Sequence, residues 1–275
     1  MAMEHFDFRR PILVLALAGL TGHVAASDRT TAPLTLDAVL SDTHRLAQAG
    51  KLASGISKAR LEAIKEAALG YGVRSGLARR SYEVGQIIME NQSMLDSIYN
   101  FAAMVLDKNV LPPVLQEAQN SLNQSGSDTI RIVDATYRIE RQAQFVTAPP
   151  NWRDYLMRDF RYTTDVPSSA LLPTTDGEKA IWQQFVSEGW KVGMDQANQI
   201  FDRSLARLER DYKGMILYKS LLAKGMISKP YVAEADLGVT GDGNSININD
   251  RILRITAKPQ LEVNPASWKS VVVPK

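Results

Sequence analysis

Apolar residues recur every three or four positions between residues 57 and 106, the spacing of one face of an α-helix. The repeat is carried by Leu61, Ile64, Ala68, Tyr71, Ile87, Met94, Leu95, Ile98, Phe101 and Val105. This pattern predicts either one long helix or two helices in sequence, and the Pro112-Pro113 pair disfavours helix beyond it. Shorter helices are predicted over residues 36–49 and 114–122.

A second long helix is predicted to begin at Thr175-Asp-Gly-Glu178, which has the sequence of a capping box. In this motif the threonine hydroxyl accepts a hydrogen bond from a helical amide, and the glutamate reaches back to the cap amide. The helical spacing continues to Tyr212. An end or bend is expected near Gly214, followed by a further helical segment that stops at Gly225.

Two segments alternate between apolar and polar residues with the period of a β-strand. Residues 129–146 are predicted to form a hairpin that turns at Asp134-Ala135-Thr136. Residues 246–255 are predicted to form another, which turns at Asn249-Asp250 and pairs Ile246 with Leu253. Because helices and antiparallel strands occupy separate parts of the chain, the predicted fold class is α+β, with long helices packed with antiparallel β-hairpins.

Small residues form a ridge at intervals of four on each long helix: Ala68, Gly72 and Gly76 on the first, and Gly189, Gly193 and Ala197 on the second. Glycine inside a helix costs about 1 kcal/mol relative to alanine, so its repetition indicates a compensating contact. We expect the helices to approach closely along these ridges, with helix breaks as the alternative. Leucine at Gly72 or Gly193 should then be destabilising, and alanine far milder.

The first residues have the pattern of an export signal. Arg9 and Arg10 precede a short apolar run over residues 11–20, and small residues follow at Val24-Ala25-Ala26. This arrangement predicts a signal peptide over residues 1–26, with a buried N-terminal helix as the alternative. Residues 27–55 are predicted to form a flexible leader and residues 56–275 a single α+β domain. Export places the protein in the periplasm.

The composition excludes several kinds of chemistry. The 275-residue chain has 32 Lys and Arg against 30 Asp and Glu, a formal net charge of +2 that does not indicate bulk nucleic-acid binding. It has no cysteine, which excludes disulfides, thiolate metal sites and cysteine nucleophiles. Its three histidines are His5, His23 and His44, and the first two lie in the predicted signal peptide. We therefore expect no catalytic residue, metal site or cofactor.

The glycine-rich segment 238–244 fits neither a dinucleotide-binding fingerprint nor a calcium loop, because the glycine spacing and the ligand positions are wrong. It is predicted to form a tight turn, with contact to a partner as the alternative. Among the aromatic residues, Trp182 is expected in the core, whereas Trp152 and Trp268 are expected at the surface. The candidate partner-contact residues are Trp152, Tyr155, Asp236, Gly238, Thr240, Gly241, Asp242 and Gly243.

Three segments resemble a known family: residues 109–156, beginning NVLPPVLQEAQNSLNQSG; residues 214–268, beginning GMILYKSLLAKGMISKPY; and GVRSGLARRSYEV, residues 72–84. They are similar to the DotC family, called TraI in IncI-type plasmid conjugation. The likeness covers about residues 57–268. It implies a component of a type IVB (Dot/Icm-like) secretion system that supports a secretin-like outer-membrane subunit, alongside a small lipoprotein.

The chain departs from the family at one place. Family members are typically lipoproteins with a cysteine after Leu-Ala-Gly, whereas here Leu17-Ala18-Gly19 is followed by Leu20. Acylation at that position is therefore excluded, and attachment to the outer-membrane complex is expected through protein partners. The resemblance further implies a multi-copy hetero-oligomeric ring and no direct contact with nucleic acid.

Two functions follow from these observations. The first is a non-enzymatic structural subunit of the transfer apparatus. The alternative is a periplasmic peptidoglycan-acting enzyme of the same machine, which would need a carboxylic general acid in a cleft. The candidates for that acid are Glu90, Glu178 and Glu188, and a glutamate at the base of a large concave pocket would favour the enzyme.

Overall fold

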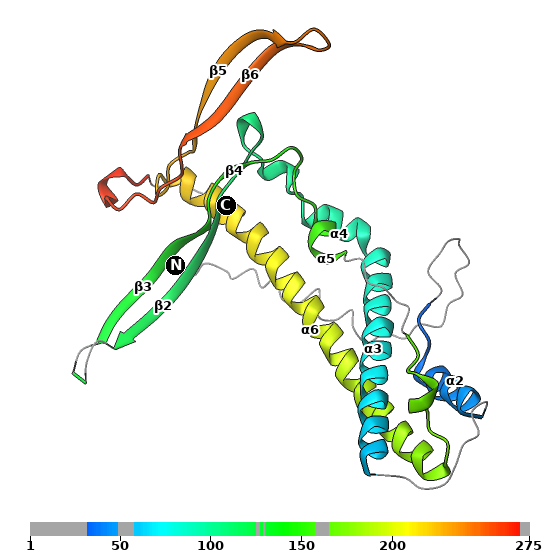
Figure 1. Cartoon of the computed structure of the whole chain (residues 1–275). Helices are drawn as coiled ribbons and strands as arrows, with labels where there is room; N and C mark the ends of the chain where they lie inside the picture. Colours follow the sequence, from blue (N-terminus) through cyan, green and yellow to red (C-terminus); the bar gives the residue numbers. More distant parts are fainter. Residues whose placement is uncertain (1–31, 49–57, 125–126, 129, 158–164, 270–275) are drawn as a thin grey trace. The chain divides into compact units, whose positions relative to one another are not determined.

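The computed structural model describes residues 32–48, 58–124, 127–128, 130–157 and 165–269, all of which lie within one compact unit of the chain, residues 32–275 (Figure 1). Its helices are α2 (Leu36–Gln48), α3 (Lys58–Glu90), α4 (Gln92–Ile98), α5 (Trp152–Leu156) and α6 (Asp176–Ala223). Its strands are β1 (Val110–Leu111), β2 (Val114–Gln124), β3 (Ile130–Arg141), β4 (Gln144–Phe145), β5 (Tyr231–Gly241) and β6 (Ile246–Ala257). The α+β class is confirmed, since each described sheet is an antiparallel pair: β1 with β4, β2 with β3 and β5 with β6.

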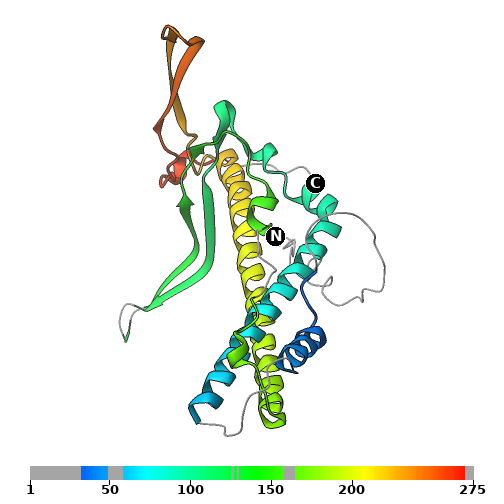
Figure 2. The ribbon, with the colours of Figure 1, turned by 45° about the vertical axis from the view of Figure 1, so that its right-hand side comes forward.

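Helices α3 and α6 cross at the two glycine ridges, which confirms the predicted packing (Figure 2). A Cβ atom added at Gly72 would lie 3.0 Å from the Trp190 amide nitrogen and closer still to the Val186 carbonyl oxygen. A Cβ at Gly193 would lie 2.7 Å from the Leu77 amide nitrogen. Because these obstacles are backbone atoms, we now expect alanine as well as leucine to be destabilising at these positions.

Helix α6 is a single 48-residue helix. Its N-terminus has the predicted capping box: the Thr175 hydroxyl accepts a hydrogen bond from the Glu178 amide, and the Glu178 carboxylate accepts one from the Thr175 amide. The helix continues through Gly214, so the predicted end there is wrong. The role of that glycine is close approach, because an added Cβ would lie 2.6 Å from the Leu115 carbonyl oxygen of β2. Gly225, with φ +70°, follows the end of the helix as predicted.

The first hairpin differs from the prediction at both ends. Residues 114–122 form strand β2 and not a helix, and β3 continues through Asp134-Ala135-Thr136 without turning. The two strands pair with each other, for example Leu115 with Ile139 and Leu122 with Ile132. The polar sequence QEAQNSLNQ has no strong strand signal of its own, so its conformation depends on cross-strand pairing with β3.

The second hairpin also has a different turn. Strand β6 passes through Asn249-Asp250 and pairs Ile246 with Gly241 and Leu253 with Glu234. Gly238, with φ +69°, pairs with Asp250, and Asn249, with φ +58°, is the extra residue of β6 where the register shifts. A local irregularity within the strand therefore accounts for the turn-like dipeptide. The chain reverses at residues 242–245 instead.

Among the residues that the structure describes, the buried side chains form three groups. One lies between α3, α6 and α2 and includes the fully buried Trp182, as predicted. The second joins α4, α5 and α6 around Trp152, and the third joins Leu115 of β2 to Tyr218 of α6. The third group attaches the base of the β2–β3 hairpin to the C-terminal half of α6.

Part of the sequence analysis lies outside the described residues. The predicted signal peptide, residues 1–26, falls there, as does much of the predicted leader. Within the leader, α2 confirms the predicted short helix, and its Val39 is fully buried. Among the described helices, none combines the length and the hydrophobicity required to span a bilayer.

Candidate functional site

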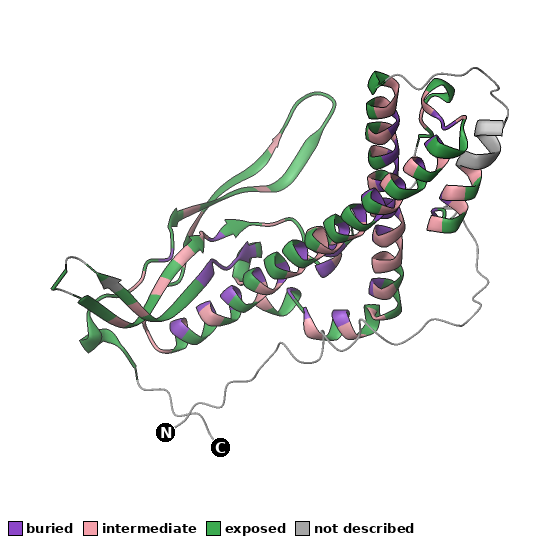
Figure 3. Ribbon diagram, turned by 90° about the horizontal axis from the view of Figure 1, so that it is seen from below, coloured by how far each residue is buried: buried purple, intermediate pink, exposed green. Residues whose placement is uncertain are grey.

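The β5–β6 hairpin, here called the β5–β6 finger (residues 231–257), is exposed along most of its length (Figure 3) and carries an aliphatic cluster near its turn. Val239 and Ile248 are direct cross-strand partners, and Ile246 lies on the same face two residues before Ile248. Their side chains are 69%, 74% and 71% exposed, respectively. Three aliphatic side chains together on one exposed face are typical of a protein-contact surface.

Carboxylates shape the turn end of the β5–β6 finger. Asp242 Oδ1 accepts hydrogen bonds from the amides of Asn244 and Ser245, at 2.8 and 2.9 Å, and these bonds lower the pKa of Asp242. Asp236 accepts one from the Gly238 amide at 2.9 Å, and Asp250 accepts one from the Thr240 hydroxyl at 2.6 Å. Asp236 and Asp242, two of the predicted partner-contact residues, therefore also stabilise the backbone conformation around the turn.

The base of the β5–β6 finger is held by ion pairs. Glu234 pairs with Lys108 at 2.8 Å and with Arg251 of the opposite strand at 3.0 Å. The hydrogen bond from Lys108 and the one from Arg251 lower the pKa of Glu234. Lys108 comes from the segment before β1, so the finger is attached to a distant part of the chain.

The β2–β3 hairpin, here called the β2–β3 finger (residues 114–141), has the same construction. Leu122 and Ile132 are cross-strand partners, and Ile130 lies on the same face. They are 72%, 68% and 62% exposed. Leu115, near the base, is buried against α6. Sequence analysis did not select this cluster, because residues 114–122 were expected to be helical.

Residues 58–270 match the TraI family of the type IV secretory system, described as conjugal DNA-protein transfer. The chain belongs to this family. The match covers the region of the predicted resemblance and confirms it. No curated protein matches the sequence.

In this TraI-family chain, the expected surface position of Trp152 is wrong. Its side chain is fully buried, and its Nε1 donates a hydrogen bond to Asp96 of α4 at 2.7 Å. The capping box of α5 explains the burial, because Asn151 and Asp154 fix the helix start and leave the indole facing the core. Arg153 covers the outer face of the ring at 4.1 Å and pairs with Asp96. A fully buried indole is not available as a partner contact.

Tyr155 is half-buried and belongs to a polar junction. Its hydroxyl donates a hydrogen bond to the buried carboxylate of Asp211 at 3.0 Å, and Arg141 of β3 pairs with the same carboxylate at 3.0 Å. Burial raises the pKa of Tyr155, and the charge of Asp211 raises it further. This junction joins α5 and the base of the β2–β3 finger to α6.

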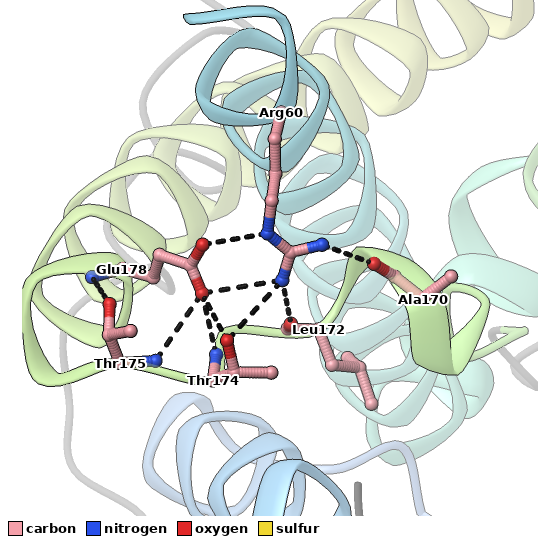
Figure 4. Close-up of polar contacts among 6 residues, drawn as sticks. All are labelled: Arg60, Ala170, Leu172, Thr174, Thr175 and Glu178. Atoms are coloured by element: carbon pink, nitrogen blue, oxygen red, sulfur yellow. Dashed lines mark hydrogen bonds and ion pairs between the residues drawn. The ribbon is translucent and has the colours of Figure 1, made fainter. Parts of the chain in front are cut away.

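Glu178 is the best enclosed of the three glutamates proposed as a general acid, and Figure 4 shows its surroundings. Its carboxylate pairs with Arg60 of α3 at 2.8 Å and accepts hydrogen bonds from the Thr174 amide and hydroxyl at 2.7 and 2.8 Å. Burial alone would raise the pKa of Glu178, but the hydrogen bonds from Arg60 and Thr174 lower it to about 2. A carboxylate that stays ionised cannot donate a proton near neutral pH.

The other two glutamates, Glu90 and Glu188, are exposed. Hollows along α6 include one of about 60 Å³ between α3, α5 and α6, and one of about 230 Å³ whose lining includes Asp154, Tyr155, Arg203 and Arg207. Neither is lined by a glutamate. In the described part of the chain, no group of three His, Asp or Glu side chains is arranged to hold a metal ion.

Proposed function

We propose that this chain is a non-enzymatic structural subunit of a type IVB secretion or conjugal transfer apparatus. In this proposal it supports the assembly of the outer-membrane core. The observation that carries the proposal is the pair of exposed fingers, each with a fixed base and an aliphatic cluster near its turn. Such surfaces contribute affinity when a partner removes them from water.

The polar residues of the site support a structural role over the enzymatic alternative. The enclosed carboxylates of Glu178 and Asp211 are already paired with arginines, and they join separate elements of the fold. A general acid near neutral pH needs a raised pKa and access to substrate. Glu178 has the opposite pKa shift and is almost completely buried.

The proposed location is the periplasm, at the outer-membrane complex. Its basis is the signal-peptide pattern of residues 1–26 together with the family membership. Because the chain has no cysteine to acylate, we propose that it is held there by the secretin-like subunit and the small lipoprotein of the system. A ring of several copies and the absence of direct nucleic-acid contact are parts of the same proposal.

Transfer assays test this function. The assay uses a strain from which the gene for this chain has been deleted and to which a variant is supplied. The variant with Val239→Thr and Ile248→Thr should lower transfer and reduce co-purification of the core subunits. The substitutions Glu90→Gln and Glu188→Gln keep shape and should leave transfer unchanged. Loss of transfer from either glutamine variant, with the core still assembled, would instead support the enzyme.

A further inference from the structure

The two hollows beside α6 are adjacent, since Ile200 and Ser204 line both. We call the combined feature the α6 groove and define it by Ile88, Leu156, Ile200, Phe201, Arg203 and Arg207. One end is apolar, and the other carries two exposed arginines and one exposed aspartate, Asp154. In the described structure, neither of these arginines forms an ion pair: Arg203 donates a hydrogen bond to Gln199, and Arg207 lies over the Tyr155 ring at 5.5 Å. Both therefore keep their charge available.

The β5–β6 finger has the complementary properties. From residue 236 to residue 250 it contains three aspartates and no lysine or arginine. The same stretch carries the exposed Val239, Ile246 and Ile248. The finger is thus apolar and acidic, whereas the groove is apolar at one end and has two arginines against the single Asp154 at the other. Matching of both kinds is what gives a protein interface its affinity and its register.

The geometry points to an interaction between copies of this chain, in which the β5–β6 finger of one copy binds in the α6 groove of the next. This inference rests on the proposed function, in which the β5–β6 finger is a contact surface, and it names a second copy of the chain as the partner. The two surfaces differ, so the contact is head-to-tail, and each bound chain leaves one finger and one groove free. Repetition of such a contact gives a closed ring or an open filament.

Charge and burial favour a second copy as the occupant. The β2–β3 finger has an equally exposed aliphatic cluster, but Arg131 and Asp134 both lie on the strand that carries Ile132, so it lacks a uniform charge. The β5–β6 finger is the one whose charge is opposite to that of the groove. Its aliphatic side chains remain exposed within one chain, so they are free to bind the groove of another molecule.

The test measures the self-association of the purified full chain by sedimentation velocity over a range of concentrations. The finger variant carries Val239→Thr and Ile248→Thr, and the groove variant carries Arg203→Glu and Arg207→Glu. Each should weaken self-association by at least about tenfold. The matched controls are Leu122→Thr with Ile132→Thr, which alters the same kind of pair on the other finger, and Lys58→Glu with Lys191→Glu, which changes the net charge equally. The controls should stay within about twofold of the unaltered chain.

A mixture of the two variants gives the sharpest result. Because each variant supplies one intact surface, an equal mixture should form a complex of two chains that does not grow further. A chain that stays monomeric at every concentration, a control pair as damaging as the test pair, or a mixture that does not associate would each overturn the inference.

Self-association and transfer fail independently. If the unaltered chain is monomeric but the finger variant still loses transfer, this inference is contradicted and the proposed function is not. A chain that self-associates as described, but whose finger variant transfers normally, contradicts the proposed function alone.

Discussion

Alanine is normally a better helix former than glycine, yet the crossing of α3 and α6 predicts that Gly193→Ala destabilises the protein. The new Cβ would lie 2.7 Å from the Leu77 amide nitrogen and closer still to the Val73 carbonyl oxygen. Ordinary contact requires about 3.5 Å. Neither atom can rotate away, because both belong to the backbone of α3, so the two helices must separate by about 1 Å.

The expected cost follows from two opposing effects. Overpacking of a well-packed interior costs about 1–3 kcal/mol, and a rigid obstacle places this site at the upper end. The greater helix propensity of alanine returns about 1 kcal/mol. The net loss in the free energy of unfolding is therefore about 2 kcal/mol, which lowers the melting temperature by about 4–8 °C for a domain of this size.

Gly70 of α3 provides the matched control. A Cβ there would meet only the flexible end of the Arg74 side chain, at 3.4 Å. Gly70→Ala should therefore be neutral or stabilise the protein by up to about 1 kcal/mol. Urea unfolding followed by circular dichroism measures both variants. If Gly193→Ala is as stable as Gly70→Ala, the helices do not depend on close backbone approach at this position, and the packing argument is refuted.

Three further predictions concern single residues. The folded pKa of Glu178, about 2, lies below its ordinary value of 4.5, so its ion pair stabilises the protein above pH 4.5 and loses this effect as the pH falls toward 2. Urea unfolding measures the stability from pH 7 to pH 3. The variant Glu178→Gln, which is already destabilised at pH 7, should lose less stability over this range than the unaltered chain. Trp152→Phe removes the hydrogen bond to Asp96 and should lower the free energy of unfolding, measured in urea, by about 1–3 kcal/mol. Self-association of the folded chain should not change. A weakened self-association would show that Trp152 contributes to a partner contact after all. Mass spectrometry of the exported protein should find a chain that begins at Ser27 without acylation, and a lipid-modified product would contradict the signal-peptide assignment.

The long helices were predictable because their signals are local. The capping box at Thr175 and the glycine after α6 act within a few residues, and the glycine ridges repeat with the helix itself. The same ridges predicted a tertiary contact, since several helical glycines on one face are explained only by a close neighbour. Their spacing did not give the distance to that neighbour. For this reason the sequence alone gave no ground to expect that alanine is destabilising at the ridges.

The hairpins were harder because strand pairing is not local. Asn249-Asp250 has the composition of a turn, and only its partner Gly238 on the other strand shows that it lies within β6. The polar residues of β2 gave no reason to expect a strand until β3 was placed beside them. Trp152 was misplaced for a related reason, because its burial depends on Asp96, 56 residues away.

In each finger, the residues near the base stabilise the fold, and the residues near the turn are exposed for contact with other molecules. Near the base, side chains are buried or ion-paired: Leu115 against α6 in one finger, and Glu234 with Lys108 and Arg251 in the other. Near the turn, the aliphatic side chains are exposed, so their burial adds little to the folding of a single chain. An isolated two-stranded hairpin is only marginally stable in water, which explains why each base needs its anchor. Substitutions near the turn of the β5–β6 finger should therefore alter self-association with little effect on folding, and substitutions at the base of either finger should do the reverse.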